Sequence, residues 1–465
     1  MNRIWTKDAV NKVGEKVLLK GWVNTRRNMG KIVFIDLRDR SSLAQVVFVP
    51  QELDEQSNEA VKKIRPEFVV EIEGIVNARP KNQINQEMLT GSIEILAKKL
   101  TILSEAKTPP FTIDNEIIAA NEELRLKYRY LDLRHERVKN NLILRSQVCQ
   151  FFRDYLNREG FLEVETPILT KGTPEGAREF AVPSRLYPGK FYVLPQSPQQ
   201  FKQLLMVGGI ERYFQLARCF RDEDARGDRQ PEFTQLDLEM SFVNQEDVLA
   251  LNERMFIELI KTVAPKKIVT TVPFPRISYQ EAIEKYGNDK PDLRKDKTNP
   301  DELAFCWIVD FPMFEPVEGG DLQATHHPFC MPNPEDVSLL DTDPLRVRAA
   351  SYDLVLNGYE LSSGSIRIHQ RELQQKIFEL LGLSKELIQA RFGHMLEAFE
   401  YGTPPHGGMA PGIDRLVMIL ANEPNIREVI PFPKTTDAKD LMMEAPSEMT
   451  EEQLKEINIC LRNKK

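Results

Sequence analysis

The chain has 465 residues, of which 41% are hydrophobic and 28% charged, and its net charge is −8. A mildly negative protein does not attract nucleic acid through its overall charge, so any such contact must come from local basic patches. It has no signal-peptide pattern, no apolar run near the roughly 18 residues of a membrane span, and five scattered cysteines without a C-x-x-C pair. We therefore expect a cytoplasmic protein of two or three domains, with no membrane contact, disulfide or zinc cluster.

Residues 1–104 contain five short stretches in which apolar and polar residues alternate, with a helical pattern near 51–65. This arrangement is typical of a small Greek-key β-barrel of the OB type. Cations interleaved with an aromatic residue on its first strands suit single-stranded nucleic acid, whose bases stack and whose phosphates carry charge. An ordinary solvated face is the alternative, and the barrel alone leaves both open. The side chains concerned are Arg26, Arg27, Lys31, Phe34, Arg38 and Gln45.

Residues 105–133 are polar and contain paired prolines, which is typical of a linker or hinge. A long amphipathic helix follows at roughly 134–159 and ends at Gly160. From there strands and helices are mixed to the end, so we expect residues 134–465 to form one α+β catalytic domain. Neither a phosphate loop nor a dinucleotide-binding motif occurs in it.

A highly charged loop separates two alternating stretches, 213–221 and 233–242. One face of the second stretch is apolar, and the other carries Phe233, Gln235, Asp237 and Glu239. A solvated sheet surface would explain this polar row without any function. The loop, however, is rich in arginine, which can hold phosphate in bidentate fashion while an aromatic ring stacks a base. The loop side chains are Arg221, Asp222, Glu223, Arg226, Arg229 and Gln230.

The segment SYDLVLNGYELSSGS predicts a hairpin, because the Asn-Gly pair at 357–358 is a strong two-residue turn signal. With that turn, Leu354 pairs with Leu361. Asp353 and Glu360 then become diagonal neighbours roughly 7–8 Å apart or less. Two carboxylates at this spacing can share Mg²⁺, which keeps phosphate oxygens as further ligands. A pair of solvated carboxylates is the alternative.

Residues 407–421, GGMAPGIDRLVMILA, combine glycines with an apolar helix that carries Asp414 and Arg415 in its first turn. Glycines let a backbone approach a ligand closely, and an arginine at this place can meet a base or a terminal phosphate. The segment is a third element of a candidate nucleotide site.

Three segments resemble, in order, the signature motifs of class II aminoacyl-tRNA synthetases: FLEVETPIL, FRDEDARGDRQPEFTQLDLE and GMAPGIDRL. Further segments resemble the bacterial-type aspartyl-tRNA synthetases in particular, namely TKGTPEGAREF, LPQSPQQFKQLL, HHPF, YELSSGSIRIH and FPKTTDAKDLMMEAPS. The resemblance covers nearly the whole chain, including the N-terminal barrel. It implies an antiparallel catalytic sheet and a homodimer built around the first motif, where Pro167 lies.

The resemblance also implies the reaction. ATP and L-aspartate form aspartyl-adenylate with Mg²⁺ as cofactor, and the aspartyl group passes to the 3′ end of tRNA-Asp. Arg221 and Arg415 would be the catalytic residues, with Arg221 on the α-phosphate. ATP contacts are implied for Arg221, Asp222, Glu223, Gln230, Phe233, Glu360, Gly412, Ile413, Asp414 and Arg415, and metal contacts for Asp353 and Glu360.

The family supplies two cations for the aspartate side chain, at positions that match Lys202 and Arg367. Asp237 would hold these cations in place and limit the repulsion between them. Related asparaginyl enzymes have an acidic residue where Lys202 stands, so Lys202 is the best single residue for choosing aspartate over asparagine. The implied aspartate contacts are Glu175, Ser197, Gln199, Lys202, Arg221, Asp237, His326, His327 and Arg367.

In the barrel, Arg27, Phe34 and Gln45 match positions that stack on and read the anticodon. Glu94 matches a fourth such position, with Ser92 as the alternative alignment. One departure is large, because bacterial members carry an inserted domain of about a hundred residues. Here the polar stretch 287–303 joins the flanking sequences directly. Two alternatives stay open: an enzyme that also charges tRNA-Asn, and a non-catalytic RNA-binding paralogue.

Overall fold

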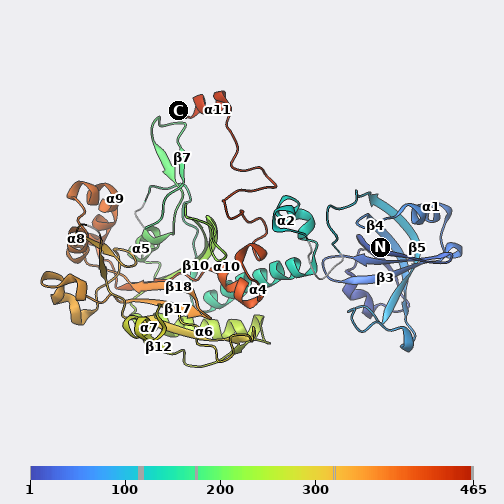
Figure 1. Ribbon diagram of the computed structural model, residues 1–465, viewed down its shortest axis with the longest axis horizontal. Helices are drawn as coiled ribbons and strands as arrows, with labels where there is room; N and C mark the ends of the chain where they lie inside the picture. Colours follow the sequence, from blue (N-terminus) through green and yellow to red (C-terminus); the bar gives the residue numbers. More distant parts are fainter. Residues whose placement is uncertain (1, 114–119, 173–175, 318, 320, 462–465) are drawn as a thin grey trace. The chain divides into compact units, whose positions relative to one another are not determined.

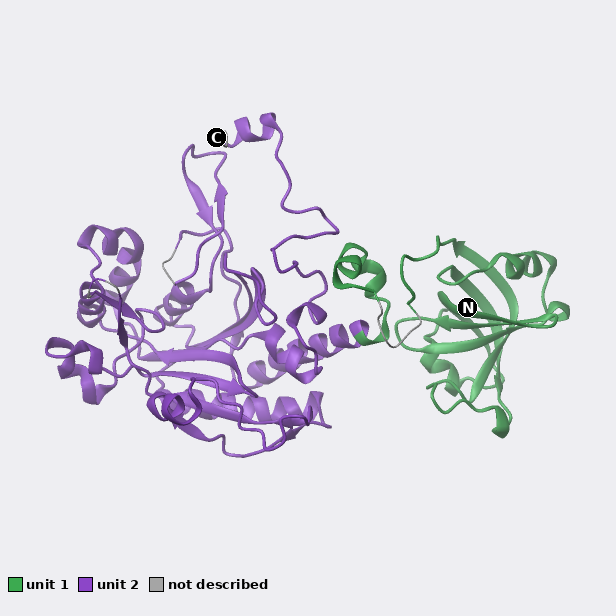
Figure 2. Ribbon diagram, viewed as in Figure 1, with its two compact units in different colours: residues 1–137 green, residues 138–465 purple. Residues whose placement is uncertain are grey.

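The computed structural model describes residues 2–113, 120–172, 176–317, 319 and 321–461. The chain forms two compact units, residues 1–137 and 138–465 (Figure 2). The first unit includes the segment 105–133, which the sequence predicts to be a linker between the domains. Each unit has its own apolar core.

The first unit contains a closed five-stranded barrel in the order β1-β2-β3-β5-β4. Alternation of buried and exposed residues along β1 follows the period of two that a barrel wall requires. This confirms the predicted OB fold, and the helical pattern expected near 51–65 corresponds to a helix between the third and fourth strands. The elements are β1 (Lys16–Met29), β2 (Ile32–Arg38), β3 (Leu43–Phe48), α1 (Glu55–Lys63), β4 (Val69–Ala78) and β5 (Ile93–Ser104).

Two short helices, α2 (Glu122–Lys127) and α3 (Arg129–Asp132), follow the barrel in the first unit. The buried carboxylate of Asp132 joins them, because it accepts hydrogen bonds from the guanidinium groups of both Arg125 and Arg129. The predicted long helix is α4 (Glu136–Arg158), and Gly160 at φ +82° lies just beyond its end.

The second unit is built on an eight-stranded sheet in the order β12-β14-β17-β18-β19-β10-β9-β6 (Figure 1). Pairing is antiparallel except between β12 and β14 and between β6 and β9. With the helices around it, this sheet gives the predicted α+β class. Its strands are β6 (Leu162–Glu163), β9 (Arg212–Phe220), β10 (Glu232–Ser241), β12 (Arg276–Ser278), β14 (Phe305–Val309), β17 (Ser351–Leu356), β18 (Tyr359–Ile366) and β19 (His406–Met409).

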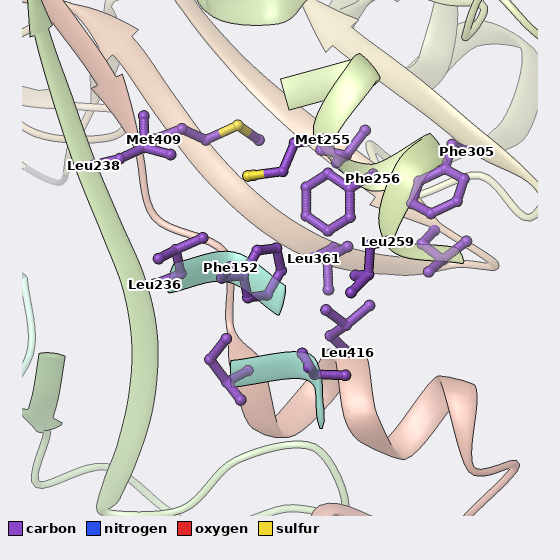
Figure 3. Packing of buried hydrophobic residues seen from close by; sticks show 14 of the residues in the cluster. Phe152, Leu236, Leu238, Met255, Phe256, Leu259, Phe305, Leu361, Met409 and Leu416 are labelled. Atoms are coloured by element: carbon purple, nitrogen blue, oxygen red, sulfur yellow. The ribbon is translucent and has the colours of Figure 1, made fainter. Parts of the chain in front are cut away.

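The main core lies on one face of this sheet, where α4, α6 (Gln245–Val263) and α10 (Ile413–Leu420) pack (Figure 3). Leu236 and Leu238 of β10 lie in this core with Phe152 of α4 and Phe256 of α6. Because side chains alternate along a strand, the polar residues of β10 must point to the opposite face. The sheet therefore separates the packed core from a polar surface.

The other elements surround the sheet or extend from it. No helix among the described residues is both long and apolar enough to span a membrane. The remaining helices are α5 (Gln199–Val207), α7 (Tyr279–Tyr286), α8 (Arg371–Leu380), α9 (Lys385–Ala398) and α11 (Glu451–Glu456). The remaining strands are β7 (Ala181–Pro183), β8 (Phe191–Val193), β11 (Ile268–Val269), β13 (Glu302–Leu303), β15 (Phe314–Pro316) and β16 (Leu322–Ala324).

Candidate active site

A cavity of about 340 Å³ lies over the polar face of β10. Phe233, Gln235 and Asp237 of that strand line it, so the polar row predicted from alternation borders a cavity instead of a solvated surface. The wall also includes most of the predicted site: Ser197, Gln199, Lys202, Arg221, Glu223, Gln230, His326, His327, Glu360, Arg367, Gly412, Asp414 and Arg415.

The wall of this cavity carries several buried polar atoms that have no hydrogen-bond partner within the described part of the chain. Such atoms are uncommon in folded proteins, since an unpaired buried donor or acceptor costs about 1–3 kcal/mol. Those on this wall could be satisfied by a polar ligand that enters the cavity. The atoms belong to Gln199, Arg221, Asp237, His326, Ser362 and Arg415.

One end of the cavity holds two buried cations with two buried carboxylates. Nζ of Lys202 is 2.7 Å from Oδ1 of Asp237 and 3.2 Å from Oε2 of Glu239. Nε of Arg367 is 2.9 Å from Oε1 of Glu239, and all four side chains are at most 2% exposed. Burial by itself would raise the pKa of Glu239, but Arg367 and Lys202 outweigh it and the pKa is lowered. Burial outweighs the effect of Lys202 at Asp237, so the pKa of Asp237 is raised. The group thus places two cations beside two acidic side chains.

Glu239 is absent from the predicted site, although it belongs to the same polar row as Asp237. It binds both cations, whereas Asp237 binds only Lys202 through a direct ion pair. Gly408 on the neighbouring β19 makes room for it, because a Cβ at that position would lie 2.2 Å from Oε2 of Glu239. The two acids at alternate positions on β10 already indicated in the sequence that Glu239 shares the face of Asp237.

His326 contacts Phe311, and His327 contacts Arg367. Nη1 of Arg367 donates to Nε2 of His327 at 2.8 Å, which requires that ring nitrogen to be unprotonated. Burial, together with the Arg367 guanidinium, holds the pKa of His327 well below its usual range. His326 packs edge-on against Phe311, with ring centroids 4.5 Å apart, and burial lowers its pKa.

The two predicted catalytic arginines approach the cavity from different elements. The guanidinium carbon of Arg221, just after β9, lies 5.1 Å from the ring centre of Phe233. Arg415, in the first turn of α10, donates to the backbone carbonyl of Glu360 and to Oδ2 of Asp228 at 2.9 Å. Arg221 and Arg415 line the same cavity.

The predicted hairpin is β17–β18. Asn357 at φ +52° and Gly358 at φ +85° form its turn, as a type I′ turn requires. The predicted pairing of Leu354 with Leu361 is wrong, because Leu354 pairs with Ser362. The extra residue, Leu361, forms a β-bulge and its side chain is buried in the main core.

Asp353 and Glu360 on this hairpin are both acids, and their charges repel each other. Burial, with repulsion from Glu360, raises the pKa of Asp353 well above its usual range. Burial opposes ionisation of Glu360 as well, but Lys290 holds its pKa low. Oδ1 of Asp353 is buried without a hydrogen-bond partner among the described residues. A buried carboxylate oxygen of this kind fits a hard divalent cation, and phosphate oxygens would complete the ligand set.

Asp353, Asp222 and Ile413 do not line the main cavity, whereas Asp414 does. Asp222 borders a neighbouring cavity of about 310 Å³ and not the main one. The side chain of Ile413 is buried in the core. Both carboxylate oxygens of Asp414 have protein partners, Arg145 and the backbone N–H of Thr234. Glu175 falls outside the described residues.

The barrel brings three of its four predicted RNA-binding residues into one chain of contacts. Arg27 donates to Asp36 at 3.1 Å and to Gln45 at 3.4 Å, and Gln45 donates to Glu94 at 3.4 Å. The fourth residue, Phe34, is half-buried and lies opposite Arg27 in the β1–β2 register. Phe34 alternates with the buried Ile35, so it does not belong to the barrel core.

Two family descriptions match the chain. Residues 121–436 match the class II tRNA synthetases for D, K and N, and residues 17–103 match the OB-fold nucleic acid binding domain of the anticodon-binding family. Together these matches cover the barrel and most of the second unit.

Curated relatives extend over nearly the same length. An aspartate–tRNA(Asp/Asn) ligase from Rubrobacter xylanophilus is 44% identical over 573 positions, which include 97% of this chain and 95% of the relative. An aspartate–tRNA ligase from Geobacillus kaustophilus is 43% identical, with 97% of each chain covered. The first alignment is 108 positions longer than the 465-residue chain, so the relative has internal residues that this chain lacks.

Two solved structures have a similar fold at low identity. An aspartyl-tRNA synthetase from Entamoeba histolytica matches with a TM-score of 0.72 at 24% identity, over 93% of this chain and 91% of that one. An asparaginyl-tRNA synthetase from Pyrococcus horikoshii, complexed with asparaginyl-adenylate, matches with a TM-score of 0.75 at 24% identity, over 94% of this chain and 98% of that one.

Proposed function

Because the chain belongs to the class II aminoacyl-tRNA synthetases, in the group for aspartate, lysine and asparagine, we propose that it is an aspartate–tRNA ligase. A carboxylate oxygen of aspartate attacks the α-phosphorus of ATP, and the bond to pyrophosphate breaks. A ribose hydroxyl of the tRNA then attacks the aspartyl carbonyl, and AMP leaves. The protein is thus an ATP-dependent, AMP-forming enzyme.

The group of four buried charges is the observation that carries the choice of aspartate. Lys202 and Arg367 offer hydrogen-bond donors to a side-chain carboxylate. In the free protein, Asp237 and Glu239 offset the repulsion between these two cations. The neutral side-chain amide of asparagine would interact less favourably with two cations. The side chain of aspartate would therefore lie at this end of the cavity.

Arg221 and Arg415 line the same cavity, and both would bind the triphosphate. Negative charge that develops around the α-phosphorus would be stabilised by the Arg221 guanidinium, and Phe233 offers a ring for the adenine. The attacking carboxylate is already a nucleophile, so no general base is needed, and the protein accelerates the reaction by positioning the two substrates. Asp353 and Glu360 would hold Mg²⁺, which supplies positive charge to the phosphate oxygens when bound.

Pyrophosphate exchange tests the amino acid assignment. With ATP and labelled pyrophosphate, aspartate should support exchange, while asparagine and lysine should not. Exchange with asparagine or lysine in place of aspartate would refute the assignment. No exchange with any amino acid, together with intact RNA binding, would favour the non-catalytic paralogue.

A second candidate is an enzyme that charges both tRNA-Asp and tRNA-Asn. The relative from Rubrobacter xylanophilus is named for both tRNAs, whereas the one from Geobacillus kaustophilus is named for aspartate–tRNA alone. Arg27, Phe34, Gln45 and Glu94 would contact the anticodon in either case. Parallel charging of the two purified tRNAs distinguishes these possibilities.

We also propose a homodimer formed through the segment around Pro167. Leu162, Ile168 and Leu169 in this segment are 54%, 45% and 54% exposed in the single chain, and a second copy would cover them. Sedimentation of the protein should then give the mass of two chains. An enzyme that supplies charged tRNA to translation would act in the cytoplasm.

A further inference from the structure

Lys290 contacts the candidate metal site from a segment that the sequence marks only as a polar surface connection. It lies between α7 and β13, and its Nζ is 2.9 Å from Oε2 of Glu360. The side chains of Lys290 and Glu360 are 36% and 34% exposed, so the pair is partly shielded from solvent. Glu360 lines the main cavity. The ammonium therefore lies at the edge of the active site.

Packing of the neighbouring residues fixes the position of this lysine. Pro291 is buried, and Leu293 packs against an apolar cluster that includes Val355 of β17. A Cβ on Gly358, at the tip of the hairpin, would lie 3.5 Å from Cβ of Asp292 and 3.9 Å from the carbonyl oxygen of Lys290. The segment thus leans on the same hairpin that carries the two acids. Lys290 is placed by the fold and does not reach Glu360 from a free loop.

The ammonium group of Lys290 is surrounded by negatively charged side chains. Glu360 and Asp353 both interact electrostatically with Lys290, and Asp289 adds a third negative charge nearby. Without a cation, Asp353 and Glu360 would repel each other across the hairpin. The ammonium reduces that repulsion in the free protein. A divalent cation on Oε2 of Glu360 and the ammonium of Lys290 cannot occupy the same place.

We propose that Lys290 is an internal counter-cation that competes with the divalent metal for Glu360. The proposal rests on the proposed function only for the identity of the metal site. In the free protein the ammonium neutralises Glu360, and metal binding requires that it move away. The acid pair is then compensated by a positive charge in both states. Lys290 would thereby set the metal concentration at which the site fills.

Direct metal binding tests this proposal without any turnover. Mn²⁺ is titrated into the full-length protein without nucleotide, and free Mn²⁺ is followed by electron paramagnetic resonance. Lys290→Met removes the charge and keeps the length, Lys290→Arg keeps the charge, and Lys295→Met is a matched control on the same segment. Lys290→Met should bind Mn²⁺ about fivefold more tightly than the unmodified protein, which corresponds to the upper end of the range for an exposed ion pair. The other two variants should stay within about twofold of it.

A double variant shows where the added affinity arises. Adding Glu360→Gln to Lys290→Met should abolish the gain, because Glu360 is the shared ligand. In the exchange assay, Lys290→Met should need correspondingly less Mg²⁺ for half-maximal rate. Unchanged or weaker Mn²⁺ binding in a folded Lys290→Met variant would overturn the proposal, as would a raised KM for ATP at saturating Mg²⁺ with unchanged Mn²⁺ affinity. Because the titration needs no amino acid, it can succeed even where aspartate-dependent exchange fails.

Discussion

Glu239 and Arg367 form a two-point ion pair in the interior of the catalytic unit, with Nε to Oε1 at 2.9 Å and Nη2 to Oε2 at 3.3 Å. The partners are 128 residues apart in the chain and come from β10 and from just beyond β18. Glu239 also contacts Lys202, so one carboxylate holds both cations proposed for the aspartate side chain. If aspartate binds at these cations as proposed, this arrangement would couple protein stability to substrate binding.

Replacing Glu239 by Gln should destabilise the free protein by about 3–5 kcal/mol, because two buried cations lose their shared counter-charge. Aspartate brings a carboxylate to the same cations, so saturating aspartate should raise the melting temperature of Glu239→Gln more than that of the unmodified protein. Thermal unfolding with and without aspartate measures this difference.

Two controls accompany the measurement. Asparagine should give no such rescue, because its side chain is neutral. Glu258→Gln removes an exposed partner of Arg158 and should change the free energy of unfolding by at most about 1 kcal/mol. Equal stabilisation of both proteins by aspartate would argue against a shared role for Glu239.

Lys202→Met should weaken aspartate far more than ATP. Loss of one partner in a buried, hydrogen-bonded charge pair costs about 2–5 kcal/mol, or roughly 30-fold or more in KM for aspartate. The KM for ATP should stay within about threefold, since the triphosphate is proposed to lie near Arg221 and Arg415. Pyrophosphate exchange at varied aspartate and ATP gives both constants. Lys261→Met, on the surface of α6, is the control, and an unchanged KM for aspartate in Lys202→Met would contradict the pocket assignment.

Arg221→Ala should reduce kcat/KM for adenylate formation by at least about 10²–10³-fold, the usual effect of losing a donor to developing charge. Arg221→Lys should recover little, because an ammonium cannot bind two oxygens in parallel. Single-turnover adenylate formation measures the loss. Arg218→Ala, which removes an exposed partner of Glu232 outside the cavity, is the matched control. Normal kinetics in Arg221→Ala would exclude Arg221 from the reaction.

The sequence predicted local features of the site better than contacts between distant segments. Alternation along 233–242 predicted which side chains share the polar face, and the Asn-Gly pair predicted the turn of the hairpin, because both are local backbone properties. The bulge at Leu361 was missed, since it depends on packing against a core formed by distant helices. Lys290 was missed for the same reason, because its partner is on another element.

Phe34→Ala tests the barrel independently of the chemistry. Loss of a stacked base costs about 1–3 kcal/mol, so the KM for tRNA in aminoacylation should rise roughly 5- to 150-fold. Pyrophosphate exchange without tRNA should be unaffected. Because Phe34 is half-buried and outside the barrel core, the melting temperature should change little. A similar loss in both assays, with a lowered melting temperature, would mean that Phe34 acts through packing.

The neutral ring of His327 predicts a specific dependence of stability on pH. Its folded pKa lies well below the ordinary value of 6.5, because of burial and because Arg367 faces it. As the pH falls through about 6.5, the unfolded chain takes up a proton at this residue and the folded protein does not. The stabilisation is thus complete above pH 6.5 and is lost progressively below it, by up to about 1.4 kcal/mol per pH unit until the folded pKa is reached.

Urea unfolding between pH 8 and pH 5.5 measures this effect. The difference in free energy of unfolding between the unmodified protein and His327→Asn should be constant above pH 7 and should shrink below pH 6.5, since Asn does not titrate. Carboxylates elsewhere contribute equally to both proteins, so they cancel in the difference. Saturating aspartate would add a negative charge near Arg367 and make a protonated His327 less unfavourable in the folded protein. The decline should then keep its onset near pH 6.5, which the unfolded chain sets, but end at a higher pH and be smaller in total. A difference that stays constant down to pH 5.5 would mean that the ring is not held neutral by the contact with Arg367.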